Sequence, residues 1–189
     1  MKELSLNILD VAKNSVKAEA SLIEIELIET EKTLLIRIKD DGYGMDKEFL
    51  SRVLDPFSTS RTTRKVGLGL PLLKLAAEQT EGSLSISSVP RGGDQPSGTT
   101  VEAFFHKDHI DFTPLGDIVS TIELLIQGNP DIDFRFVHTM PDKEVSLDTR
   151  ELREVLGDEV PLNDFAVLSW IRGSLEEQYE EQGSNPDME

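Results

Sequence analysis

The sequence predicts an α+β fold with a small α/β appendage at its C-terminal end, and three observations support this. Segments with apolar residues at helical spacing alternate along the 189 residues with segments in which every second residue is apolar. Three pairs of the alternating segments are joined by short polar or glycine-rich turns, which is typical of hairpins. Hydrophobic residues make up 38% of the chain, enough for a packed core.

The first half of the chain has the clearest periodicity. Residues 4–20 are expected to form a helix, and the alternation over 21–29 and 33–41 predicts two strands separated by a polar turn. A short helix is expected over residues 47–54. Residues 55–66 lack periodicity, which indicates a mobile loop.

A third helix is expected to follow Gly67 and Gly69 and to end near Gly82. The stretch PRGGDQPSG then joins two further strands, SLSISS and TTVEAFF, into a hairpin. The sequence therefore predicts helices and hairpins in alternation up to about residue 105.

The second half restarts with different patterns. Thr113 and Pro114 suit the start of a helix and Gly128 suits its end. The segments DFRFVHT and KEVSLDT flank a turn and predict a hairpin, followed by helices over 149–156 and 164–179. We therefore expect one domain over residues 1–107, a small acidic α/β domain over 108–180, and a disordered tail over 181–189.

Charge differs sharply between the two parts. Residues 1–105 carry 13 basic and 16 acidic side chains, whereas residues 106–189 carry 6 and 20, within a total net charge of −17. Nucleic acid and anionic membrane surfaces are therefore poor partners for the second part. A basic partner protein is compatible with this charge, although acidity alone also serves solubility.

Several classes of site and location are excluded by what the sequence lacks. The chain has no cysteine, which excludes disulfides, thiolate metal sites and a cysteine nucleophile. It has no run of 18 apolar residues, and its first ten residues are too polar for a signal peptide. A cytoplasmic protein is expected.

The first predicted helix carries an unusual polar stripe. Asn7, Asp10, Asn14 and Lys17 are spaced three and four residues apart, so they share one face of the helix. Because the rest of the helix is apolar, this face is expected to meet the sheet. Asn14 would then supply an amide oxygen to Mg²⁺, and Asp10 would orient or deprotonate a nucleophile. The alternative is a solvated stripe on the surface.

A second polar feature, DDGYGM, follows a predicted strand. Alternation places Asp40 on the buried face, where a carboxylate needs a hydrogen-bond donor such as the amino group of adenine. Gly42 and Gly44 leave room for the backbone to approach the base. The alternative is an ordinary Asp-Gly turn.

A third feature is the pair Gly67 and Gly69 ahead of a helix, whose free N–H groups suit phosphate. Arg61, Arg64 and Lys65 precede it in a loop rich in Ser and Thr, where they would fold over a polyphosphate as a lid or form a solvated loop. The sequence contains no P-loop motif.

In this order the features resemble those of the GHKL superfamily of gyrase, heat-shock chaperone, histidine kinase and mismatch-repair ATPases. NILDVAKNSVKAEA is similar to the asparagine box, DDGYGM to the first glycine box, DPFSTSR to part of a kinase lid, and GLGLPL to the second glycine box. Thr99 follows Gly98 at the position of the late threonine. Among members, the chain most resembles stand-alone histidine-kinase-like ATPase-domain proteins of anaerobic bacteria.

The resemblance implies a two-layer α/β sandwich of the Bergerat type, with a mixed, mostly antiparallel sheet that binds ATP and Mg²⁺. It implies that Asn14 binds the metal and that Asp10 stands where other members have a glutamate general base. The residues expected to contact the nucleotide are Asn14, Lys17, Asp40, Gly42, Gly44, Met45, Arg61, Arg64, Lys65, Gly67, Leu68, Gly69, Leu70 and Thr99.

Two classes of function remain open. One is an enzyme, either a protein kinase that acts in trans on an unidentified phosphoacceptor or a slow ATPase. The other is a nucleotide-gated interaction module with little catalysis. The apolar face of the helix over 164–179 offers either a homodimer or partner surface or a packing face for its own hairpin.

Overall fold

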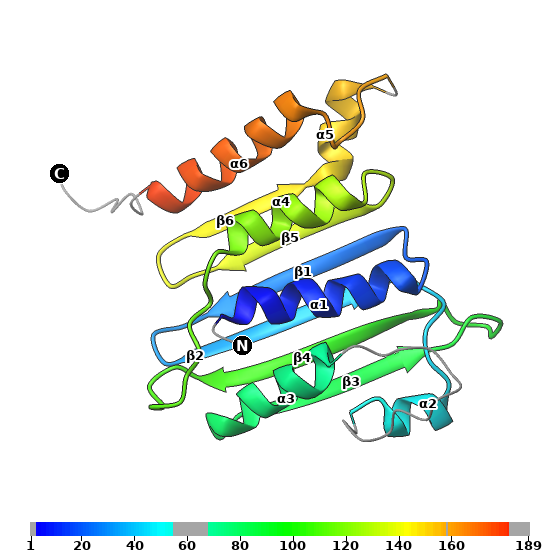
Figure 1. The fold of residues 1–189 in the computed structure, drawn as a ribbon, viewed down its shortest axis with the longest axis vertical. Helices are drawn as coiled ribbons and strands as arrows, with labels where there is room; N and C mark the ends of the chain where they lie inside the picture. The colour runs from blue at the N-terminus through cyan, green and yellow to red at the C-terminus, as the bar shows by residue number, and fades with distance from the viewer. Residues whose placement is uncertain (1–2, 55–67, 158, 182–189) are drawn as a thin grey trace.

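The computed structural model describes residues 3–54, 68–157 and 159–181. It contains one six-stranded sheet in the order β3-β4-β2-β1-β5-β6, with helices packed on one face (Figure 1). The strands are β1 (Leu22–Glu29), β2 (Thr33–Asp40), β3 (Ser83–Val89), β4 (Gly98–His106), β5 (Asp133–Thr139) and β6 (Glu144–Asp148). The helices are α1 (Leu4–Lys17), α2 (Lys47–Arg52), α3 (Gly69–Gln79), α4 (Ile118–Gly128), α5 (Thr149–Leu156) and α6 (Phe165–Glu180).

The sheet is mixed but mostly antiparallel. Four of its strand pairs are antiparallel, and only β1 and β5 run parallel. This confirms the α+β sandwich expected from the resemblance. None of the described helices is both long enough and apolar enough to cross a membrane.

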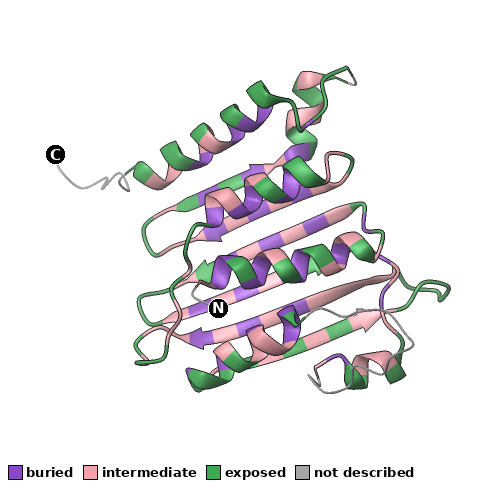
Figure 2. Cartoon of the chain, in the orientation of Figure 1, coloured by how far each residue is buried: buried purple, intermediate pink, exposed green. Residues whose placement is uncertain are grey.

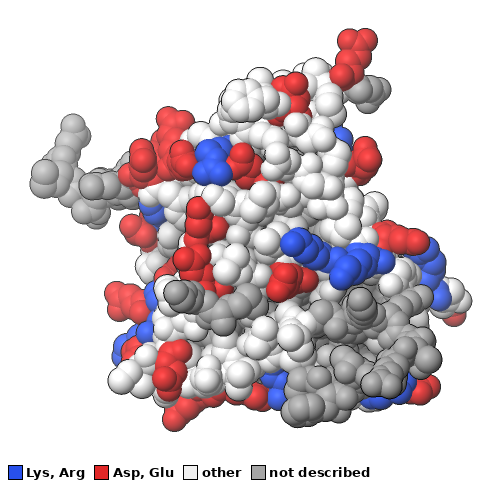
Figure 3. Space-filling model, viewed as in Figure 1, with Lys and Arg blue, Asp and Glu red and all other residues white. Residues whose placement is uncertain are grey.

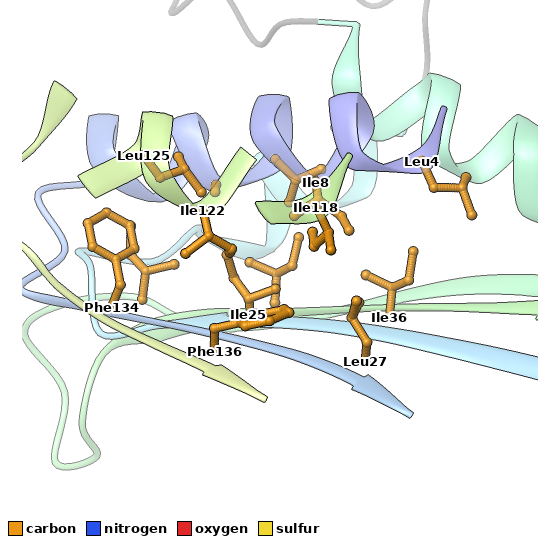
Figure 4. Packing of buried hydrophobic residues seen from close by; sticks show 14 of the residues in the cluster. Leu4, Ile8, Ile25, Leu27, Ile36, Ile118, Ile122, Leu125, Phe134 and Phe136 are labelled. Atoms are coloured by element: carbon orange, nitrogen blue, oxygen red, sulfur yellow. The ribbon is translucent and has the colours of Figure 1, made fainter. Parts of the chain in front are cut away.

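The core lies between the sheet and its helical layer. Alternation along β1 buries Ile23, Ile25 and Leu27 on the helix-covered side. Figure 4 shows Leu4 and Ile8 of α1, Ile118, Ile122 and Leu125 of α4, and Ile25, Leu27, Ile36, Phe134 and Phe136 of the strands pointing into this layer. The buried positions in Figure 2 follow the same pattern along the central strands.

On the opposite face of the central strands, basic side chains of one strand lie beside acidic side chains of the next. Arg37 on β2 bonds Glu26 of β1 at 2.9 Å and Glu102 of β4 at 2.7 Å, and Arg135 on β5 bonds Glu26 at 2.9 Å. Burial alone would raise the pKa of Glu26, but hydrogen bonds from Arg135 and Arg37 hold this pKa below its usual value. These ion pairs partner the charged side chains on the sheet face opposite the helices.

The second part of the chain extends the same sheet. Strand β5 lies against β1 with Phe136 in register with Ile25, and buried residues of both parts form one apolar cluster. The predicted hairpin and both C-terminal helices are confirmed. The division of the chain into domains at residue 107 stays a prediction, because a shared sheet does not decide whether the parts fold separately.

The start of α4 differs from the sequence prediction. The helix begins at Ile118 rather than near Thr113, and Asp117 caps it by accepting a hydrogen bond from the Ser120 N–H. The residues before α4 instead accept hydrogen bonds from the start of α1. The Leu4 N–H donates to the Pro114 carbonyl at 2.9 Å, and the Ser5 N–H donates to the Leu115 carbonyl at 2.8 Å. The carbonyls of this segment thus satisfy two of the free N–H groups of α1.

The end of α1 also differs. The helix ends at Lys17 rather than at residue 20, because Glu19 adopts a left-handed conformation with φ 57° and the Ala20 N–H turns back to the Ser15 carbonyl at 3.2 Å. This early end brings the backbone of residue 18 to the mouth of the pocket described below.

Phe136→Ala should lower the free energy of unfolding by about 3–5 kcal/mol, because Phe136 is fully buried where β5 packs beside β1. Urea denaturation followed by circular dichroism measures this. Phe165→Ala is the matched control, since Phe165 is 85% exposed on α6 and its loss should change stability by less than about 0.5 kcal/mol. Equal effects of the two substitutions would contradict the described core.

Candidate functional site

A pocket of about 480 Å³ opens between α1, α2, the start of α3 and the ends of β2 and β4. Its size is typical of sites for small molecules. Most of its lining is apolar, with a few polar groups from α1 and the strand ends. The lining residues are Val11, Asn14, Ser15, Lys17, Ala18, Asp40, Tyr43, Gly44, Met45, Phe49, Val53, Leu70, Thr99 and Val101.

Asp40 is the principal charged group on the sheet side of this pocket. It ends β2 on the helix-covered face, as alternation predicts, and is only 9% exposed. The Ser15 hydroxyl donates to its Oδ2 at 2.6 Å, and the Gly42 N–H donates to its Oδ1 at 3.0 Å. A carboxylate has about four acceptor sites, so Asp40 keeps acceptor capacity for a donor in the pocket.

The glycine-rich turn after β2 is held close to both neighbouring elements. The Tyr43 N–H donates to the Ala18 carbonyl at 2.9 Å, and the Arg91 N–H donates to the Tyr43 carbonyl at 2.8 Å. Gly44 has φ +69°, and a Cβ there would lie 2.0 Å from the Val89 carbonyl oxygen. Only glycine fits this position without moving the β3–β4 connection.

Thr99 lies opposite Asp40 in the pairing of β4 with β2. Its hydroxyl is 2.8 Å from that of Ser88 on β3, which also donates to the Gly98 carbonyl at 3.0 Å. The Met45 N–H donates to the same Ser88 oxygen at 2.8 Å. Ser88 therefore fixes both Thr99 and Met45 at the pocket wall.

Helix α1 supplies the polar groups at the pocket mouth. Asn14 is half-buried, and its Nδ2 atom is buried without a hydrogen-bond partner among the described residues. Lys17 lines the pocket and is exposed. Figure 3 shows basic side chains gathered over the C-terminal half of this helix, where Lys13 and Lys17 are exposed.

Asp10 does not lie where the polar stripe predicted. The expectation that this face of the helix is buried holds for Asn7, which is 2% exposed, and is partly met by Asn14. It is wrong for Asp10 and Lys17, which are exposed. The helix backbone at Asp10 lies against the start of α3, since a Cβ at Gly69 would lie 2.8 Å from the Asp10 Cβ, but the Asp10 side chain stays exposed to solvent. Asp10 therefore lies at the junction of the two helices, one turn before Asn14.

The start of α3 adds Leu70 to the pocket lining, whereas Leu68 is 60% exposed. Gly69 is buried, and its missing side chain permits the close approach to α1. Four residues predicted to contact the nucleotide lie outside the described part of the chain. These are Arg61, Arg64, Lys65 and Gly67.

Several lining residues were missed by the sequence reasoning. Val11, Ser15 and Ala18 recur at helical spacing beside Asn14, and Val101 alternates inward with Thr99, so periodicity contained a signal for them. The residues from the turn and α2 had no comparable signal, because their positions depend on how the turn folds. These are Tyr43, Phe49 and Val53.

The arrangement can bind a flat aromatic group that carries a hydrogen-bond donor, because apolar walls surround one buried carboxylate with free acceptor sites. The amide donor of Asn14, which has no partner in the part of the chain that the structure describes, and the ammonium of Lys17 suit an anionic group at the mouth. A ligand with an aromatic base at one end and phosphates at the other meets both requirements.

Comparison with known proteins finds a family model and several relatives that match this chain. The family model described as histidine kinase-, DNA gyrase B- and HSP90-like ATPase matches residues 2–109. DNA mismatch repair protein MutL of Actinobacillus pleuropneumoniae is 25% identical over 88% of this chain, and sporulation kinase D of Bacillus subtilis is 34% identical over 47% of it. The chain spans only 33% and 18% of the lengths of these two relatives.

A solved structure shares the fold across both parts of the chain. The Aquifex aeolicus MutL ATPase domain complexed with ADP matches with a TM-score of 0.53 and 14% sequence identity, covering 92% of this chain and 88% of that one. The match therefore includes most of the six-stranded sheet.

Gly44→Ala should destabilise the protein by about 1–3 kcal/mol, because a side chain at φ +69° is strained and its Cβ would meet the Val89 carbonyl. Thermal unfolding of the purified chain measures this. The control is Gly93→Ala in the β3–β4 connection, where an added Cβ meets nothing within 4 Å. If Gly44→Ala unfolds at the same temperature as Gly93→Ala, the close approach of the turn to β3 is not present in solution.

Proposed function

Because the chain belongs to the histidine kinase-, DNA gyrase B- and HSP90-like ATPase family, we propose that its pocket binds Mg-ATP and that it transfers the terminal phosphate to a protein in trans or, slowly, to water. The observation that carries this proposal is the buried Asp40 carboxylate in an apolar pocket. The residues around it account for the binding of each part of the nucleotide.

Asp40 accepts a hydrogen bond from the exocyclic amine of adenine. Ser15 and Gly42 donate to the two carboxylate oxygens, so the group is oriented and its charge is stabilised before the base enters. Apolar walls that include Met45 and Val101 cover the base and exclude water. The carboxylate thereby selects for a donor at this edge of the base.

Asn14 holds the phosphate end of the nucleotide together with Mg²⁺. Its buried Nδ2 donates to a phosphate oxygen, and the Oδ1 of the same amide is a suitable ligand for the ion. A bound Mg²⁺ neutralises charge on the phosphates. Lys17 adds a second positive charge at the mouth of the pocket.

Asp10 acts as the general base. It lies one helical turn before Asn14 on α1, so its carboxylate projects near the phosphate end, and its exposure leaves access for a hydroxyl group or water. The carboxylate orients this nucleophile and accepts its proton. The relative named as a kinase supports a protein acceptor, and the description of the family as ATPases supports water.

Asp40→Asn should weaken the binding of Mg-ADP by roughly 10–100-fold, because a charge-assisted hydrogen bond worth about 1.5–3 kcal/mol is replaced by an amide that also presents a donor to the adenine amine. Isothermal titration calorimetry measures the affinity. Asp131→Asn is the matched control, since Asp131 is exposed before β5 and should leave the affinity unchanged. Equal affinities for both variants and the wild type would remove Asp40 from the binding site.

A nucleotide-gated interaction module is the second candidate function. It is favoured by exposed leucines on the helical layer, since Leu6 on α1 is 43% exposed, Leu68 is 60% exposed and Leu75 on α3 is 51% exposed. Such side chains suit contact with a protein partner. In this case phosphate transfer is incidental.

Asp10→Asn separates the two candidates. If the chain is an enzyme, the substitution should lower phosphate transfer by about 100-fold or more while the affinity for Mg-ADP stays within about twofold, because the base acts on the nucleophile and not on binding. Incubation with γ-labelled ATP, Mg²⁺ and cell extract follows label into free phosphate, this chain or another protein. Unchanged transfer in Asp10→Asn would exclude Asp10 as the base.

A further inference from the structure

Away from the pocket, one buried histidine joins three separate elements. His138 on β5 is 2% exposed. Its Nε2 lies 2.9 Å from Oε2 of Glu29 on β1, and its Nδ1 lies 2.8 Å from the hydroxyl of Tyr179 on α6. We propose that Glu29, His138 and Tyr179 form a protonation-sensitive latch that holds the C-terminal half of α6 on the sheet.

Glu29 and His138 lie at the ends of two rows of buried apolar side chains, one on β1 and one on β5. Buried side chains along β1 continue to Leu27 and are followed on the same face by Glu29, while those along β5 continue to Phe136 and are followed by His138. Leu27 and His138 are register partners. Tyr179 brings the end of α6 to this polar edge, and its ring meets that of His138 edge-on at 5.8 Å.

The neutral imidazole satisfies all three groups without redirecting the hydrogen of the Tyr179 hydroxyl. The Glu29 carboxylate is an acceptor, so the proton of the neutral ring is on Nε2, and Nδ1 then accepts from the Tyr179 hydroxyl. Protonation of Nδ1 removes this acceptor and forces the Tyr179 hydroxyl to turn its hydrogen elsewhere. The added charge is also enclosed by the packing of β1, β5 and α6.

The charged groups around His138 do not offset the cost of a positive charge on its buried ring. Glu29 attracts it, but Glu29 is already paired with Lys107, and Lys143 in the β5–β6 turn adds a second ammonium. The nearby acidic groups of β6 and α4 have other partners, since Glu144 accepts from Thr139 and Glu123 pairs with Arg172.

These surroundings set the direction of the pH response. Burial lowers the pKa of His138 below its usual value of 6.5, although Glu29 opposes the shift. Burial also raises the pKa of Tyr179, which stays neutral. Once α6 is released, His138 takes a proton more readily, so the latch is intact above pH 6.5 and weakens as the pH falls below it.

Release of this end of α6 uncovers the edge of the sheet. The Gln178 side chain accepts from the Ser146 N–H at 2.8 Å and donates to the Ser146 carbonyl at 3.1 Å, and so covers the outer edge of β6. Leu175, in the same half of the helix, is fully buried. Acid therefore exposes an unpaired strand edge and an apolar helix face together.

Backbone hydrogen exchange of α6 in the full chain tests the latch. After correction for the intrinsic exchange rate, the opening constant of residues 175–180 should rise as the pH falls from 7.5 to 5.5, by at most about tenfold per unit below pH 6.5. His138→Gln should remove this dependence, because an amide keeps the donor to Glu29 and the acceptor for Tyr179 but does not titrate. Gln178→Ala should raise opening at every pH and keep the wild-type slope.

Two results would overturn the proposal. One is an opening constant of the wild type that does not change with pH, or that changes equally in His138→Gln. The other needs no variant: a titration of the His138 ring by NMR that gives a pKa at or above 6.5 would show that the folded state does not disfavour the proton.

Discussion

The pocket depends on the hydrogen bond from the Ser15 hydroxyl to the Asp40 carboxylate. This contact joins α1 to the end of β2 through two residues 25 apart in sequence, and Asn14 and Asp40 both line the cavity beside it. The close approach of the glycine turn and the pairing of Thr99 with Asp40 both follow from the position of this strand end. A buried carboxylate without such donors would be strongly disfavoured, so the site and the local fold require each other.

Much of the first part of the fold was predictable because strand and helix periodicity report which residues share a face. Alternation along β2 placed Asp40 on the buried side, and the structure agrees. Helical spacing correctly grouped Asp10 with Asn14 but gave the wrong burial for Asp10, because periodicity shows which residues share a helix face and not whether a polar residue on that face meets the sheet or solvent. The start of α3 beside Asp10 is a tertiary contact, made at Gly69 across 59 residues of sequence.

The second part of the chain shows which contacts local sequence patterns do not predict. Its hairpin and helices were identified from local patterns, but not the parallel pairing of β5 with β1, since an alternating strand carries no information about its partner. The same holds for the segment at Pro114 and Leu115, whose carbonyls satisfy the first N–H groups of α1. The C-terminal residues thus support the helix that carries Asn14, and they do so through contacts that no local pattern contains.

The most direct test of the account compares two nucleotides that differ at one edge of the base. Mg-ADP and Mg-IDP are titrated calorimetrically into the wild-type chain; inosine replaces the exocyclic amine of adenine by a carbonyl oxygen, which would face the Asp40 carboxylate. Mg-ADP should bind roughly 100-fold more tightly than Mg-IDP, because the carbonyl of Mg-IDP would place two acceptors together in a buried site. Equal affinity for the two nucleotides, or no saturable binding of either, would show that Asp40 does not bind the adenine amine.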